Sequence, residues 1–286
     1  DRVLNDIRTL GTIFGVSERA EELIARMEAQ RQTVKDAVRG RDPVRVAFYN
    51  GGQGPLFVLN SSMWADLLVT AGGESVFDPT AFQVSVEEFA AADPEVILMG
   101  TYPGQSAEDL STFLQTTFPT VSAVQNGRLY PVETINVENS IRIMYGLETI
   151  AKALHPDAFA EASAAPAAAT EQTQYPVTIE NCGRTLTFDA PPQRVLATWQ
   201  NTGEIMLALG LEDKLVGVYF GQPYAALPEY EGRYDSFNIF PQRQLPSREL
   251  IVSAEADFVF AAYPTFDFSA ENGLVKIERA SCRERV

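Results

Sequence analysis

The chain has 286 residues, of which 45% are hydrophobic, and this is enough for two domains of ordinary size with packed cores. Its formal net charge of −16 argues against a nucleic-acid-binding protein and against docking on an anionic membrane. With one histidine and two cysteines, the chain cannot supply a His-rich metal site, so we expect neither a bound metal nor another cofactor.

The sequence has no apolar run of the roughly 18–20 residues that a membrane-spanning helix needs. No signal peptide is visible, and the chain begins at Asp1 in the middle of a pattern, so we expect the native start to lie upstream. The acidity is typical of a soluble, exported monomer that meets a basic partner surface.

The first 40 residues predict a long helix, and residues 41–160 predict an α/β lobe. Ser17 is a good N-cap for a helix over residues 18–38, in which apolar residues recur at three- and four-residue steps. The lobe that follows has expected strands at 45–49, 95–99 and 128–132, a helix from Ser61 or Ser62 to 69, and a final helix at 141–154. We expect Trp64 in the core, with a cleft-lining position as the alternative, and His155 as a helix-end or packing residue.

Residues 161–174 are rich in Ala, Thr and Gln and predict a flexible linker. A second lobe follows at 175–276, with a hairpin at 178–188, strands at 194–199, 214–220 and 257–262, and a helix at 203–209. The basic, aperiodic residues 277–286 are interpreted as a tail foreign to the fold. A disulfide between Cys182 and Cys282 would suit an exported protein, but this pairing stays open.

The alternation of strands and helices predicts an α/β protein with a parallel sheet in each lobe. The lobes repeat a local pattern at one spacing: Glu249 follows Glu87 by 162 residues (249 − 87), and Asp257 follows Glu95 by the same 162 (257 − 95). Each Glu lies two residues after a serine, and each acidic residue is followed by a short apolar strand. A repeat at so long a period indicates two related lobes, which favours a ligand cleft between them.

Ligands of such folds bind at the carboxyl ends of the strands, and this rule selects the candidate binding residues. In the second lobe these are Trp199 and Gln200, Tyr219, and Tyr263; in the first lobe they are Tyr49 and Asn50. Aromatic side chains there would suit a flat macrocycle or a catecholate, although packing against the sheet is the alternative role.

Two further residues are candidates for the cleft. Phe82 precedes the repeated Ser-x-Glu pattern and is expected at the cleft mouth. Arg142 begins the last helix of the first lobe, where its guanidinium could bind an anionic ligand through two parallel hydrogen bonds; a surface ion pair is the alternative.

An enzyme is not expected. The sequence has no Gly-x-Ser-x-Gly elbow and no phosphate-binding loop that ends in Lys-Ser or Lys-Thr. Residues 51–54, Gly-Gly-Gln-Gly, follow a strand but lack a basic residue for phosphate.

Several longer segments resemble the bacterial periplasmic proteins that deliver iron–siderophore complexes, haem or vitamin B12 to ABC importers. These segments are Ala190 to Val195, Glu204 to Gly217, Leu67 to Phe77, Gly146-Leu-Glu148 to Leu154-His-Pro156, and Asp6 to Val16. The resemblance covers nearly the whole chain outside the linker and the tail.

The resemblance implies two Rossmann-like lobes joined by a long interlobe helix, with a ligand cleft between them. It implies a non-enzymatic binding protein on the periplasmic or outer face of the cell membrane, exported and in some cases lipid-anchored. The expected cargo is a ferric siderophore, with cobalamin or haem as alternatives, and the expected partner is the permease of an ABC importer. Glu87 and Glu249 match the family's glutamates that dock arginines of the permease.

The order of the lobes departs from that family, because the C-terminal-type lobe comes first here. Three explanations are open: a fragment of a tandem fusion, a circular permutation, or a misassembled sequence. The tandem explanation also allows a ligand-sensing module without transport.

Overall fold

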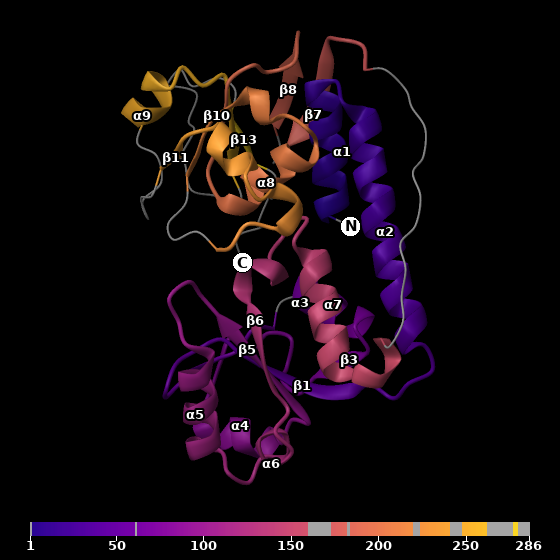
Figure 1. Cartoon of the computed structure of the whole chain (residues 1–286), viewed down its shortest axis with the longest axis vertical. Coiled ribbons are helices and arrows are strands. Elements are labelled where there is room, and N and C mark those ends of the chain that lie inside the picture. Colours follow the sequence, from indigo (N-terminus) through magenta and orange to yellow (C-terminus); the bar gives the residue numbers. More distant parts are fainter. Residues whose placement is uncertain are drawn as a thin grey trace. The chain divides into compact units, whose positions relative to one another are not determined.

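The computed structural model describes residues 2–60, 62–159, 173–181, 184–219, 224–240, 248–261 and 277–279. The chain divides into two compact units (Figure 1). Unit 1 comprises residues 1–27, 139–141 and 166–286, and unit 2 comprises residues 28–138 and 142–165. No helix among the described residues has both the length and the apolar character needed to cross a membrane.

Unit 2 is built on a parallel sheet with the strand order β3-β1-β5-β6. Its strands are β1 (Val44–Tyr49), β3 (Gly73–Ser75), β5 (Val96–Thr101) and β6 (Leu129–Glu133), and β2 (Leu56–Phe57) pairs with β4 (Gln83–Val84) in a separate antiparallel ribbon. Its helices are α3 (Ser62–Thr70), α4 (Val86–Ala92), α5 (Ala107–Thr117), α6 (Ser122–Gln125) and α7 (Ile143–Leu154), with short 3-10 helices at Thr134–Val137 and Pro156–Phe159.

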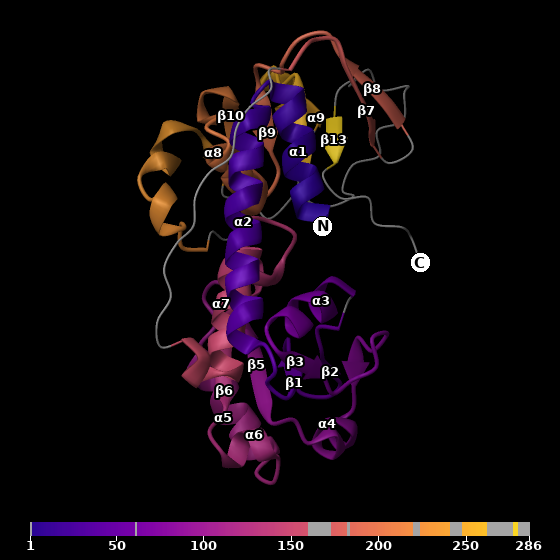
Figure 2. The same cartoon turned by 90° about the vertical axis from the view of Figure 1, so that its right-hand side faces the viewer.

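Alternation of side chains along the strands gives this sheet two apolar faces, as expected for a parallel sheet covered on both sides. Figures 1 and 2 show α3 and α7 on one side and α4, α5 and α6 on the other. On the first side Phe48 of β1 meets the ring of Trp64 edge-on at 4.6 Å. On the second side Tyr49 and Met99 join a core that includes Phe89 of α4.

Unit 1 contains a second parallel sheet, of order β11-β10-β9-β12-β13. Its strands are β9 (Val195–Ala197), β10 (Leu215–Tyr219), β11 (Ile239–Phe240), β12 (Phe258–Ala261) and β13 (Ile277–Arg279), and β7 (Val177–Asn181) pairs with β8 (Arg184–Phe188) as an antiparallel hairpin. Its helices are α1 (Arg2–Phe14), α8 (Gln200–Ala208) and α9 (Arg248–Ser253), with 3-10 helices at Glu212–Lys214, Pro228–Tyr230 and Arg233–Ser236. Helix α2 (Ser17–Val38) runs beside α1 (Figure 2). The boundary between the units falls within α2, after Met27.

Unit 1 is assembled from distant parts of the chain. The ring of Phe14 in α1 meets Phe258 of β12 edge-on at 5.4 Å. Arg19 donates to the carbonyls of Leu209 and Gly210 at 3.1 and 3.0 Å, which provides partners for acceptors at the C-terminal end of α8. The Tyr175 hydroxyl donates to the carbonyl of Ile13 at 2.7 Å. Residues 1–27 are therefore an integral part of this unit.

The α/β class with parallel sheets is confirmed, and the predicted elements occur within a few residues of their expected bounds. The helix expected from residue 203 begins at Gln200, because its first turn carries polar residues that hide the apolar period. Of the segment interpreted as a foreign tail, residues 277–279 form β13, which pairs with β12. Most of the expected linker, and both Cys182 and Cys282, lie outside the described residues.

Candidate functional site

In each unit the carboxyl ends of the parallel strands meet at one edge of the sheet, where ligands of open α/β sheets bind. At this edge of unit 2, Tyr49 is only 2% exposed and its ring stacks on Phe113 at 5.8 Å. Its hydroxyl donates to the Gly52 carbonyl at 2.6 Å, and burial raises the pKa of this phenol. Tyr49 is thus packed, with its polar tip already hydrogen-bonded.

Asn50, the next residue, is only partly buried and joins the ends of two strands. Its Oδ1 accepts a hydrogen bond from the hydroxyl of Tyr102, which follows β5, at 3.2 Å. A Cβ on Gly100 would lie 2.4 Å from the same oxygen, so only glycine leaves room for it. Tyr102 is 46% exposed and is the more accessible aromatic at this edge.

Arg142 occupies the N-cap position of α7 and is 2% exposed. Its Nη1 donates to Asn136 Oδ1 at 3.4 Å. A guanidinium this buried needs compensating partners, and Arg142 is therefore no surface ion pair. The binding of an anionic ligand by Arg142 stays a prediction.

At the matching edge of unit 1, the half-buried Trp199 directly precedes α8. The backbone N–H of Trp199 donates to Thr202 Oγ1 at 3.2 Å, which holds the first turn of the helix. Gln200 and Tyr219 are 4% and 5% exposed, and the Tyr219 ring stacks on Phe240 at 5.5 Å. Trp199 is thus the most accessible of these three candidates. The fourth candidate, Tyr263, lies outside the described residues.

Phe82 is 68% exposed and lies beside the β2–β4 ribbon, where its ring meets Phe57 at 5.5 Å. His155 caps the C-terminal end of α7, with Nε2 2.9 Å from the Gly72 carbonyl, and Trp64 is 1% exposed. As expected, His155 is a helix-end residue and Trp64 is a core residue.

The 162-residue repeat corresponds to matching hydrogen bonds in the two units. Glu95 Oε2 accepts the N–H of Arg45 at 2.9 Å, and Asp257 Oδ1 accepts the N–H of Arg194 at 2.8 Å. The guanidinium of Arg45 also donates to the Asp93 carbonyl, just after α4, at 3.1 Å. In the same way the guanidinium of Arg194 donates to the Glu255 carbonyl, just after α9, at 3.0 Å. Asp93 and Glu255, again 162 residues apart, both have positive φ, of 40° and 50°.

These bonds explain why the pattern carries an acidic residue before each strand, but they do not involve Glu87 or Glu249. Both glutamates are exposed in the first turn of their helices, α4 and α9. An acidic residue there is favourable to the helix dipole. Within the described residues, Glu87 makes no hydrogen bond or ion pair, since the capping box of α4 uses Ser85 and Glu88.

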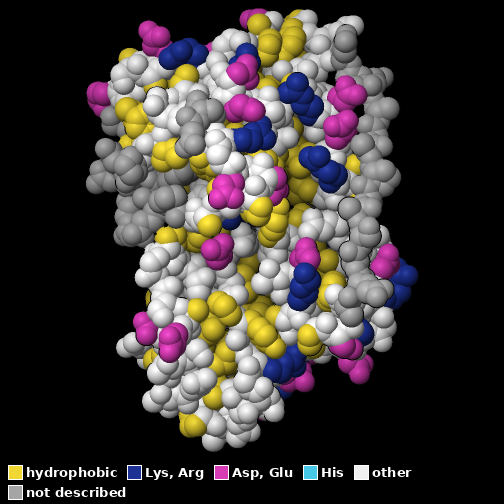
Figure 3. Space-filling view, in the orientation of Figure 1, with side chains coloured by type: hydrophobic (Ala, Val, Ile, Leu, Met, Phe, Trp, Pro, Cys, Tyr) yellow, Lys and Arg dark blue, Asp and Glu magenta, His cyan; other side chains and the backbone are white. Residues whose placement is uncertain are grey.

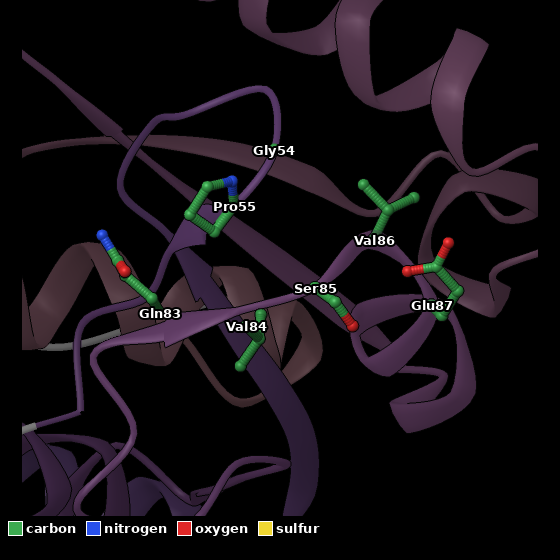
Figure 4. Close-up of a pocket in the computed structure, with 7 residues that line it drawn as sticks. All are labelled: Gly54, Pro55, Gln83, Val84, Ser85, Val86 and Glu87. Carbon is green, nitrogen blue, oxygen red and sulfur yellow. The ribbon is translucent and has the colours of Figure 1, made fainter.

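Glu87 lines a pocket of about 350 Å³ beside the β2–β4 ribbon (Figure 4). The other lining residues are Gly54, Pro55, Gln83, Val84, Ser85 and Val86. A carboxylate next to apolar side chains suits a cationic side chain with an apolar stem. On the face shown in Figure 3, acidic and basic side chains are interspersed, so the net charge does not gather there into one patch.

Sequence reasoning missed a buried polar cluster on α8. Glu204 is fully buried, and its Oε1 accepts hydrogen bonds from Gln200 Nε2 at 3.2 Å and from the Tyr234 hydroxyl at 2.6 Å. The signal in the sequence is a single glutamate at the start of an otherwise apolar stretch, residues 203–209. Among the described residues, no group of three or more His, Cys, Asp or Glu could hold a metal ion.

Residues 1–133, just under half of the chain, match a family described as "Periplasmic binding protein". No curated protein matches the chain. A periplasmic binding protein from Veillonella parvula is similar in structure, with a TM-score of 0.50 and 22% identity over 54% of this chain and 56% of that one. This likeness shows a shared fold, and the chain spans little more than half the length of that protein.

Two further structures have TM-scores of 0.46. An ABC transporter substrate-binding protein from Listeria monocytogenes is 25% identical over 54% of this chain and 63% of its own. A periplasmic heme-binding protein from Roseiflexus is 21% identical over 54% of this chain and 62% of its own.

Proposed function

We propose that this chain is an extracytoplasmic solute-binding protein that captures an iron(III)–siderophore complex and delivers it to an ABC importer. The observation that carries the proposal is the match of residues 1–133 to the periplasmic binding protein family. The parallel sheet in each unit, with aromatic residues at its carboxyl edge, supports it. The function needs binding and release of the cargo and no catalytic step.

A catecholate siderophore fits the accessible edge residues better than a small polar solute does. At the carboxyl edge of unit 1, Trp199 offers an apolar ring face. At the carboxyl edge of unit 2, Tyr102 offers a ring face and a hydroxyl as a polar tip. We assign Glu87 and Glu249 to docking of the permease, because both are exposed and both occupy the same place in the repeated pattern. Charge pairs at two such points would fix the register of the complex and speed its formation.

The two tryptophans make a direct test available. Trp199 is half-buried at the candidate edge, whereas Trp64 is buried in the core of unit 2. We would titrate the chain with a ferric tris(catecholate), with hemin and with cyanocobalamin, following tryptophan fluorescence corrected for absorption by each compound. Isothermal calorimetry would give the affinity and stoichiometry independently of the optical signal.

The proposal expects saturable quenching by the ferric catecholate that persists in Trp64→Phe and disappears in Trp199→Phe. If only hemin or only cyanocobalamin quenched the fluorescence, the solute-binding function would stand and that compound would replace the siderophore as the proposed cargo. A folded protein that binds none of the three compounds in the calorimeter would overturn the proposal.

A further inference from the structure

Two buried polar side chains on α8 hold a distant segment of unit 1 in place. Gln200 and Glu204 are 4% and 0% exposed and lie one helical turn apart. The Nε2 of Gln200 donates to Glu204 Oε1 at 3.2 Å, which orients both groups.

The segment they contact is 224–234, which follows β10 and leads towards β11. The Oε1 of Gln200 accepts the N–H of Tyr224 at 2.8 Å, and its Nε2 donates to the carbonyl of Tyr224 at 3.2 Å. One side chain thereby reproduces the two-bond pairing of neighbouring antiparallel strands. Ten residues later, the Tyr234 hydroxyl donates to Glu204 Oε1 at 2.6 Å.

Between these two points the segment packs inwards. Leu227 and Tyr230 are 4% and 7% exposed, and burial raises the pKa of Tyr230 to about 12. The guanidinium of Arg233 lies 5.5 Å from the Tyr230 ring and pairs with Glu212. Hydrogen bonds to α8 therefore anchor the segment at both ends, which we call its fastening, and its middle is packed.

Burying the carboxyl group of Glu204 costs free energy, because the group loses its hydration. An apolar residue at position 204 would avoid the loss of hydration, and replacing buried polar groups by apolar ones of similar shape is often neutral or stabilising. Gln200 and Glu204 do something that an apolar pair could not, which is to bind a backbone and a hydroxyl of one segment at two defined points.

We propose that Gln200 and Glu204 are positioning residues that shape the ligand-binding edge of unit 1 by fixing segment 224–234. In the chain, Trp199 directly precedes Gln200, and the segment begins five residues after Tyr219. The identity of the ligand rests on the proposed function, whereas the fastening of the segment does not.

The test compares variants by amide hydrogen exchange and by binding. Gln200→Leu removes both bonds to Tyr224, and Glu204→Leu removes the acceptor of Tyr234. Glu204→Gln keeps an acceptor oxygen for Tyr234 and serves as the conservative variant. Arg19→Ala is the matched control, because it removes two hydrogen bonds at the other end of α8 without touching the segment.

We expect the Tyr224 amide to exchange at least tenfold faster in Gln200→Leu, since its acceptor is gone, and Glu204→Gln to exchange as the wild type does. For whichever of ferric catecholate, hemin or cyanocobalamin the wild type binds, Kd should rise about tenfold in both leucine variants, equivalent to about 1.4 kcal/mol. In Arg19→Ala the melting temperature should fall while Kd stays unchanged.

Unchanged exchange of Tyr224 in Gln200→Leu would overturn the inference, as would a rise in Kd for Arg19→Ala equal to that of the leucine variants. A wild type that binds none of the three compounds would refute the proposed function. In that case faster exchange in Gln200→Leu would still support the fastening, and unchanged exchange would refute it.

Discussion

Replacing Phe14 by alanine should destabilise unit 1 and leave unit 2 as it is. Phe14 is 5% exposed and meets the fully buried Phe258, although 244 residues (258 − 14) separate them in the chain. Truncation of a buried phenylalanine costs about 3–5 kcal/mol, including the cavity that it leaves. With a urea m-value of about 2 kcal/mol/M, the unfolding midpoint of unit 1 should fall by about 1.5–2.5 M.

The two tryptophans allow each unit to be followed separately. In a Trp64→Phe background the remaining Trp199 reports on unit 1, and in a Trp199→Phe background the remaining Trp64 reports on unit 2. Val252→Ala is the control within unit 1, because Val252 is 58% exposed and its truncation should change stability by less than about 0.5 kcal/mol. A midpoint of unit 1 that does not move, or an equal fall in both units, would refute the assignment of α1 to unit 1.

Two further predictions concern unit 2. Gly146→Ala should destabilise unit 2 by about 1–3 kcal/mol, because the new Cβ would lie 2.0 Å from the Asn136 carbonyl oxygen. The same change inside a helix usually increases stability. A gain in stability, measured by urea unfolding followed through Trp64 fluorescence, would show that this contact is absent. Asp93 accepts hydrogen bonds from the N–H and hydroxyl of Ser122 at 2.7 and 2.9 Å, and the backbone N–H bond above all lowers the pKa of this carboxyl. Because the pKa of Asp93 is lower in the folded state, its contribution to stability is complete above the unfolded pKa and is lost as the pH falls through the folded pKa. Asp93→Asn should therefore make the stability of unit 2 depend less on pH below about pH 4. An unchanged acid transition in this variant would contradict the prediction.

The sequence predicts the regular elements well because their signals are local. Apolar steps of three and four residues identify α2, and short apolar runs identify β1, β5 and β12. Helix α1 is not identified as a separate element, because its apolar residues continue into the pattern of α2 with only Gly15 and Val16 between them.

The candidate site is predicted only in outline. The rule of strand ends selects Asn50 and Trp199 correctly as edge residues, but it cannot tell that Tyr49 and Tyr219 are buried against other rings. Burial depends on residues distant in the chain, such as Phe113 and Phe240. Tyr234 is not selected for the same reason, since its partner Glu204 lies thirty residues earlier.

The assembly of unit 1 from distant segments has a consequence for biosynthesis. Unit 2 is complete once residue 165 has been made, whereas α1 finds its partner Phe258 only after 244 further residues have followed Phe14. At about 5–20 residues per second, this leaves the apolar side of α1 without its final contacts for roughly 10–50 s. For that time Phe14, which is 5% exposed in the finished fold, lacks its partner ring and is open to a holding chaperone.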